Sequence, residues 1–297
     1  MRESLSSGVV RAGAIGLLVL FASVLAASAQ PAATPTNTAA AERVLRTVTA
    51  VAAGDDTAPR RDALMAALRS VGVEPALEPF GSDAGRGINL VVTLPGTEAR
   101  TILVGAHYDR VAVGRGVVDN AAACAALIEL IGALKASPLP RATLTFVFFD
   151  REENGLEGSR AYLAAHSTRP VYAINLDVFA YGDVMFATAS HADGVLFQHL
   201  KTAAAAAGVS VRDVVPNQYP GSDHLTLAQA GIETLGLAIV DTADVDGILK
   251  VGVAGLRAGR GPRILTLIHT PNDTLAELRP EQVVRAIGVV ERLLRAL

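Results

Sequence analysis

The chain has 297 residues, of which 51% are hydrophobic and 19% are charged, and its formal net charge is −3. This length and composition suffice for a sizeable core in one large domain or two small ones. The nearly balanced charge provides no basic stripe of the kind that nucleic-acid-binding domains carry, so nucleic acid is not an expected partner.

Residues 1–29 have the pattern of a secretory signal peptide. Arg2 and Arg11 precede an apolar run at 12–27, which ends in Ala27-Ser28-Ala29. A basic start, a short apolar run and small residues at the exit predict cleavage after Ala29 and a periplasmic or secreted protein. The competing interpretation is an uncleaved anchor, but a membrane span needs about 20 apolar residues. After cleavage, no stable membrane insertion is expected.

Residues 30–40 are rich in Ala, Pro and Thr and are predicted to be a flexible linker, followed by one catalytic domain at 41–297. Helical patterns cover 41–53 and 58–71. Two β-rich runs, 87–94 and 101–106, flank the turn Pro95-Gly96 and predict a hairpin or two neighbouring strands.

From residue 119 onward, predicted helices and strands alternate. The helix at 119–135 has Asp119 or Asn120 as its expected cap, and the apolar run at 142–149 predicts a strand buried on both faces. Further helices are predicted at 155–165, 192–206 and 280–297, and further strands at 171–178, 184–187 and 234–240. This alternation predicts an α/β fold, with a mixed, mainly parallel central sheet and helices on both faces.

Acidic residues and histidines lie where several of these elements end or begin. They are His107, Asp109, Asp119, Asp150, Glu152, Glu153, Asp177 and His269. In open α/β sheets, ligands bind outside the carboxyl ends of the strands, so we expect these side chains to converge.

The combination of imidazoles and carboxylates suits zinc, and it exceeds what one tetrahedral ion needs. It matches two ions about 3.5–4 Å apart that share a carboxylate, as in aminopeptidases and phosphatases. In an extended segment Asp109 points to the same side as His107 and can orient its ring. Glu152 and Glu153 are adjacent and diverge, so one can bind metal while the other acts as general base toward the attacking water.

Each motif alone has a simpler structural explanation, such as a helix cap or a turn, but six segments occur together in one order. They are Val104-Gly105-Ala106-His107-Tyr108-Asp109, Gly116-Val117-Val118-Asp119-Asn120, Phe148-Phe149-Asp150-Arg151-Glu152-Glu153-Asn154-Gly155, Asn175-Leu176-Asp177, Gly221-Ser222-Asp223-His224 and His269-Thr270-Pro271-Asn272-Asp273-Thr274. Through them the chain resembles the M28 family of zinc peptidases, of the aminopeptidase Y and bacterial leucyl aminopeptidase type, over residues 85–297.

The resemblance implies a zinc-exopeptidase-like fold, two Zn²⁺ ions and peptide substrates, cleaved at the N-terminus by an aminopeptidase. Asp119 would bridge the two ions. His107 and Asp177 would complete the ligands of one ion, and Glu153 and His269 those of the other.

The catalytic residues implied by the resemblance are Glu152 and Asp109. Glu152 would be the general base toward a water that bridges the metals, and Asp109 would orient His107. Related enzymes often carry Tyr just before the last histidine, where this chain has Ile268, so the donor that stabilises the oxyanion is not assigned.

Two alternative functions stay open at this point. One is a single-zinc acyltransferase resembling the glutaminyl cyclases, which share the fold. The other is a non-catalytic binding protein that keeps the fold, against which the presence of Glu152 argues. No oligomeric state is predicted.

Overall fold

The computed structural model describes residues 35–82, 85–137, 141–214, 221–250 and 261–297. The predicted signal peptide at 1–29 and residues 30–34 of the predicted linker lie outside them. Helix α1 (Pro35–Ala52) begins six residues before the predicted helix at 41–53. The linker prediction is therefore wrong for residues 35–40, which are helical.

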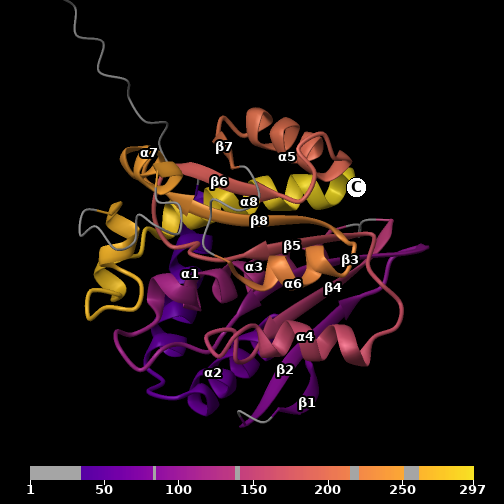
Figure 1. The fold of residues 1–297 in the computed structure, drawn as a ribbon, viewed down its shortest axis with the longest axis horizontal. Coiled ribbons are helices and arrows are strands. Elements are labelled where there is room, and N and C mark those ends of the chain that lie inside the picture. The colour runs from indigo at the N-terminus through magenta and orange to yellow at the C-terminus, as the bar shows by residue number, and fades with distance from the viewer. Residues whose placement is uncertain (1–34, 83–84, 138–140, 215–220, 251–260) are drawn as a thin grey trace, which may run out of the picture. The chain divides into compact units, whose positions relative to one another are not determined.

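A mixed eight-stranded sheet forms the centre of the molecule (Figure 1). Its order is β1-β2-β4-β3-β5-β8-β6-β7, and the four strands in the middle, β4, β3, β5 and β8, are mutually parallel. The strands are β1 (Ala76–Ser82), β2 (Gly85–Leu94), β3 (Glu98–His107), β4 (Ala142–Phe149), β5 (Tyr172–Leu176), β6 (Val184–Ala189), β7 (Ser210–Val214) and β8 (Glu233–Val240). The predicted fold class, a mixed and mainly parallel sheet in an α/β protein, is confirmed.

The predicted pairing of the runs at 87–94 and 101–106 is wrong. These runs are β2 and β3, and β4 lies between them, antiparallel to β2 and parallel to β3. The actual hairpin joins β2 to β1, a strand that the sequence pattern does not predict. Pro79 and Gly81 disguise β1, and they are tolerated because β1 is an edge strand.

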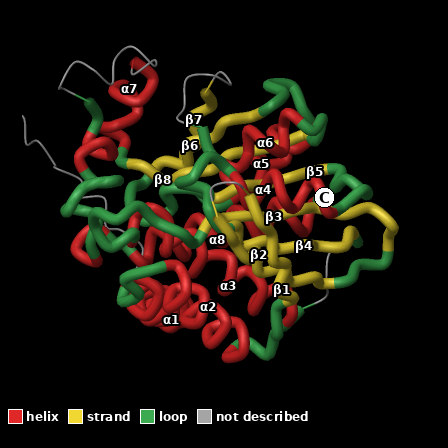
Figure 2. The backbone as a smooth tube through the Cα atoms, turned by 60° about the horizontal axis from the view of Figure 1, so that its bottom comes forward, coloured by secondary structure: helices red, strands yellow, loops and turns green. Residues whose placement is uncertain are grey.

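Helices cover both faces of the sheet, and each face has its own hydrophobic core (Figures 1 and 2). The larger core lies beneath α1, α2 (Thr57–Ser70), α3 (Ala122–Lys135), α5 (Val195–Ala206) and α8 (Pro280–Ala296). The smaller core packs α4 (Glu157–Ala165) and α6 (Asp223–Gln229) against the other face, with Phe149 and Tyr162 edge to face. The described elements also include helix α7 (Thr242–Lys250) and the 3-10 turns η3 (Arg263–Thr266) and η4 (Leu275–Glu277).

The predicted helix at 119–135 begins later than expected. A short π-helical segment, η1 (Val117–Ala121), is broken at Asp119 (φ −124°, ψ 85°) and Asn120 (φ −145°, ψ 35°), whose peptide bond is cis. Neither side chain caps α3, and the amide of Asn120 instead donates to the carbonyl of Leu176. The segment Val117–Lys135 has the length and apolarity of a membrane span, but most of it is buried as a core helix.

Candidate metal centre

The predicted site residues meet at the carboxyl ends of three neighbouring parallel strands. His107 is the last residue of β3, Glu152 and Glu153 lie on the loop after β4, and Asp177 directly follows β5. The break in η1 carries Asp119, and His269 lies on the loop after η3, in the left-handed conformation (φ 57°). Because parallel strands end at one edge, residues from distant parts of the chain gather there.

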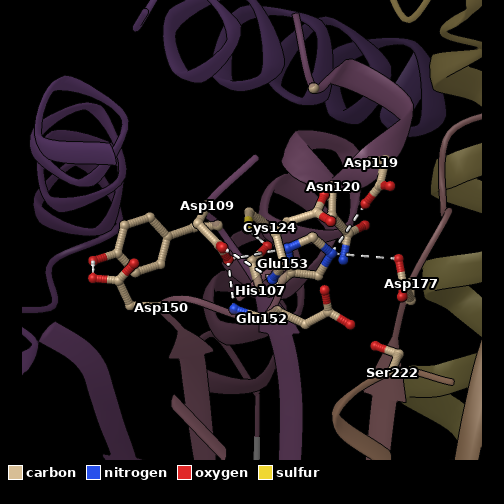
Figure 3. Close-up of polar contacts among 12 residues, drawn as sticks. His107, Asp109, Asp119, Asn120, Cys124, Asp150, Glu152, Glu153, Asp177 and Ser222 are labelled. Atoms are coloured by element: carbon tan, nitrogen blue, oxygen red, sulfur yellow. Dashed lines mark hydrogen bonds and ion pairs between the residues drawn. The ribbon is translucent and has the colours of Figure 1, made fainter. Parts of the chain in front are cut away.

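Asp119 turns one carboxylate oxygen toward each of the two histidines, and Figure 3 shows this carboxylate facing the ring of His107. Its Oδ1 is 3.0 Å from Nε2 of His107, and its Oδ2 is 3.1 Å from Nε2 of His269. Asp177 Oδ1 approaches His107 Nε2 to 3.6 Å, and Glu153 Oε2 approaches His269 Nε2 to 3.1 Å. Two groups of three potential ligands thus share one carboxylate.

The residues fit a metal by a second criterion, because two of their polar atoms lack hydrogen-bond partners. Among the described residues, Oε1 of Glu153 and Oδ1 of Asp177 are buried without one. Buried polar atoms are otherwise nearly always satisfied. Ligand atoms of His107, Asp119 and Asp177 lie within 4.8 Å of one another, as do those of Asp119, Glu153 and His269. Imidazole nitrogen and carboxylate oxygen are donors that zinc accepts.

Asp109 has a role that its spacing from His107 did not reveal. Its Oδ1 lies 3.4 Å from Nδ1 of His107, as expected for a group that orients the ring. The same carboxylate also accepts the backbone N–H of Glu152 at 3.0 Å and that of Glu153 at 3.1 Å. Asp109 therefore joins the loop after β4 to the end of β3 and fixes both glutamates relative to the histidine.

The carboxylate of Asp273 holds the backbone around Asp119. In the sequence, Asp273 is marked only by its place in the motif that begins with His269. Its buried carboxylate accepts the N–H of Val117 at 2.8 Å, of Val118 at 2.7 Å and of Asp119 at 3.3 Å. Asp273 follows His269 by four residues, so one short loop supplies a potential ligand and the anchor of another. Its place in the motif was the one signal available in the sequence.

The segment Gly221-Ser222-Asp223-His224 lies beside the centre, where Figure 3 shows Ser222 near Asp177. Ser222, Asp223 and His224 are buried, and Ser222 accepts a hydrogen bond from the amide of Asn175 on β5. Burial raises the pKa of Asp223 to about 7, and the nearby Asp109 and Asp177 add to the effect. Burial lowers the pKa of His224 to about 4. Asp150, also quoted in the motifs, points away from the centre and accepts hydrogen bonds from Ile88 N–H and the Tyr108 hydroxyl.

The centre holds more negative charge than its two histidines balance. Burial raises the pKa of Glu152 to about 9, helped by Asp177, Asp223 and Asp119 and opposed by His107. Hydrogen bonds to Asp119 and Glu153 raise the pKa of His269 to about 10. Burial alone would lower the pKa of His107, but Glu152 and the carboxylates around the ring raise it well above its usual value. Mutual shifts of this kind are typical of functional sites.

A cavity of about 340 Å³ opens onto these residues. One end is acidic and contains Asp119, Glu152, Glu153 and Asp177, with His269 beside them. The remaining wall is apolar and is formed by Gly155, Leu156, Val178, Gly221, Ile248, Pro262, Ile264, Leu265 and Ile268. Among the described lining residues there is no lysine, arginine or side-chain hydroxyl. Ile268 therefore contributes an apolar surface where related enzymes often have a tyrosine.

Comparison with known proteins agrees with this architecture. The model of peptidase family M28 matches residues 89–294. Leupeptin-inactivating enzyme 1 of Streptomyces exfoliatus is 30% identical over 185 residues, which cover 57% of this chain and 40% of that enzyme. This chain thus spans less than half the length of that relative.

Two solved structures share the fold at low sequence identity. BSAP, a zinc aminopeptidase from Bacillus subtilis, has a TM-score of 0.57 and 21% identity, covering 71% of this chain and 50% of that one. The glutaminyl cyclase of Porphyromonas gingivalis has a TM-score of 0.65 and 21% identity, covering 88% of this chain and 98% of that one.

The sheet and the cluster of carboxylates and imidazoles at its carboxyl edge define an α/β protein of the zinc-exopeptidase type. The chain belongs to peptidase family M28, as its motifs predicted. Membership in this family supports the predicted class of enzyme, the zinc-dependent hydrolases.

Proposed function

We propose that the protein is an exported aminopeptidase with two zinc ions, which hydrolyses the N-terminal residue from peptides. The observation that carries the proposal is the position of Asp119, whose two oxygens each face a different histidine at 3.0 and 3.1 Å. His107 and Asp177 would complete the ligands of one ion, and Glu153 and His269 those of the other. The signal-peptide pattern at 1–29 supports export.

Zinc in such a centre would polarise the scissile carbonyl and lower the pKa of a bound water. Glu152 lines the cavity beside the proposed ligands and is the proposed general base. It accepts a proton from the attacking water and then passes it to the nitrogen of the departing amine. The free protein holds Glu152 protonated, with a pKa of about 9. Two divalent cations nearby favour its charged form, so that it can act as a base near neutral pH.

The lining of the cavity favours cleavage at the amino end of the substrate over cleavage at the carboxyl end. A carboxypeptidase would instead have to recognise a carboxylate, for which arginine or lysine is the usual partner. No such residue is found among the described lining residues.

The apolar wall supports a preference for apolar N-terminal side chains. Leu156, Val178, Ile248 and Ile268 border the same cavity as the proposed ligands. A side chain of the size of leucine or phenylalanine loses apolar surface to water in this cavity, which contributes about 25 cal/mol per Å² buried. With Ile268 in the wall, we assign the stabilisation of the oxyanion to the metal ions.

Metal analysis combined with a peptide-library digest tests the proposal. We expect about two zinc ions per fully loaded chain, cleavage from the N-terminus, and loss of activity with a chelator that is reversed by zinc. Leucyl and phenylalanyl anilides should be cleaved faster than aspartyl or lysyl anilides. Full zinc occupancy without cleavage of any peptide would favour the non-catalytic alternative.

The glutaminyl cyclase alternative is separable by its product. The likeness to the P. gingivalis enzyme extends to the fold, and the two groups of potential ligands that share Asp119 favour a site with two ions. A cyclase would release pyroglutamyl peptide and ammonia from a peptide with N-terminal Gln. The proposed aminopeptidase would release free amino acids from peptides with other N-termini.

A further inference from the structure

Arg60 on α2 is a fully buried arginine that donates its hydrogen bonds to backbone carbonyls. Its Nε donates to Tyr108 O at 2.7 Å, Nη1 to Arg115 O at 3.0 Å and Nη2 to Gly116 O at 3.1 Å. The side chain has 0% exposed surface, and within the described residues it forms no ion pair. Burying a cation without a carboxylate partner costs free energy. A buried arginine whose three hydrogen bonds all go to backbone carbonyls therefore calls for an explanation.

The three carbonyls belong to the two ends of one loop. This loop, residues 108–116, leads from His107, the last residue of β3, to the broken segment η1 that carries Asp119. Tyr108 directly follows His107, and Gly116 lies three residues before Asp119. A single planar guanidinium thus closes the loop between two of the proposed zinc ligands.

The turn between α1 and α2 contacts the same loop a second time. Arg110 donates to the carbonyl of Asp55 at 2.6 Å, and Arg115 donates to the Asp55 carboxylate at 2.7 Å. Gly54 passes so close to Arg60 that a Cβ there would lie 2.9 Å from Arg60 Cγ. The N-terminal helices are therefore seated against the loop, although they precede residues 89–294 that the family model matches.

We propose that Arg60 is a positioning residue for the zinc site. It holds the ends of the loop 108–116 at the separation that lets His107 and Asp119 share one ion. Only arginine offers several donors in a fixed planar fork, whereas lysine offers one ammonium group that cannot reach three carbonyls in the same geometry. The inference rests on the proposed zinc site and assigns part of its preorganisation to a helix outside the family match.

The test compares Arg60→Lys and Arg60→Met with Arg69→Lys, which changes an arginine on the same helix whose side chain is 54% exposed. Zinc affinity is measured by competition with a chromophoric chelator, and Tm is measured without and with saturating zinc. We expect zinc affinity to fall about 10- to 100-fold in both Arg60 variants, as for residues that orient metal ligands. The rise in Tm on adding zinc should shrink accordingly, because it reflects affinity for the folded state.

A residue that only stabilises the fold would give a different pattern. It would lower Tm equally with and without zinc and leave the zinc affinity of the folded protein unchanged, which would overturn the proposal. Unfolding of both Arg60 variants even in saturating zinc would also overturn it, since it would assign Arg60 to the fold alone. If the wild-type chain itself binds no zinc, the proposed zinc site is wrong. This outcome is distinct from failure of the Arg60 proposal, because it is measured without the Arg60 variants.

Discussion

Replacing Asp109 by asparagine removes one of two backbone hydrogen bonds that hold the glutamate loop. The carboxylate accepts the N–H of Glu152 and of Glu153, whereas an asparagine side chain has one carbonyl oxygen and turns its NH₂ group toward the other N–H. Hydrogen bonds to charged groups contribute about 1.5–3 kcal/mol. We therefore expect the free energy of unfolding of the metal-free protein to fall by about this amount.

The same substitution should weaken zinc binding, because Asp109 also faces Nδ1 of His107 at 3.4 Å. Loss of such a partner typically lowers metal affinity about 10- to 100-fold. Urea unfolding of the metal-free protein and a zinc competition titration measure the two effects, with Asp62→Asn as control because the Asp62 side chain is 70% exposed. Unchanged zinc affinity in a destabilised Asp109→Asn protein would refute the role of Asp109 at the centre.

Three further predictions concern the centre itself. Glu152→Ala should keep its zinc, as counted by metal analysis, but lose at least about 100-fold in turnover, as expected for a general base; near-normal turnover on a peptide anilide would reject that role. Asp119→Ala should weaken the binding of both ions in a titration, and loss of only one would show that Asp119 is no bridge. In the metal-free protein, the pKa of Glu152 is raised to about 9 from about 4.3 in the unfolded chain, and that of His269 to about 10 from about 6.5. Both groups therefore stabilise the folded state at low pH, and Tm should fall as pH rises from about 5 to 10. Zinc should reverse this trend over the lower part of the range, since its ligands bind deprotonated, and a Tm of the metal-free protein that rises with pH would contradict the assigned shifts.

The parts of the structure predicted from the sequence are those that short-range patterns determine. The run at 142–149 is mostly apolar because β4 is buried on both faces. His107 and Asp177 could be found because His107 ends a largely apolar strand and Asp177 directly follows one. Strand ends meet at one edge of a parallel sheet, so the convergence of these residues could be expected before any distance was known.

The parts that were missed depend on contacts between distant segments. The strand β1 is recognisable only from its pairing with β2, because Pro79 and Gly81 hide its pattern. Asp273 resembles any turn residue until its three backbone partners at 117–119 are seen. The sequence around Arg60 is that of an exposed helical residue. Its burial depends on the loop 108–116, which is distant in the sequence and accepts its hydrogen bonds. Asp119 was expected to cap a helix, but its backbone leaves the helical conformation and its carboxylate faces the two histidines instead.

The central claim is that Asp119 bridges two zinc ions, and a crystal structure of the zinc-loaded protein with anomalous data at the zinc edge tests it most directly. We predict two zinc peaks about 3.5–4 Å apart. One oxygen of Asp119 should lie on each ion, with His107 and Asp177 on one side and Glu153 and His269 on the other. A single fully occupied zinc peak, or two peaks of which only one touches Asp119, would contradict the account.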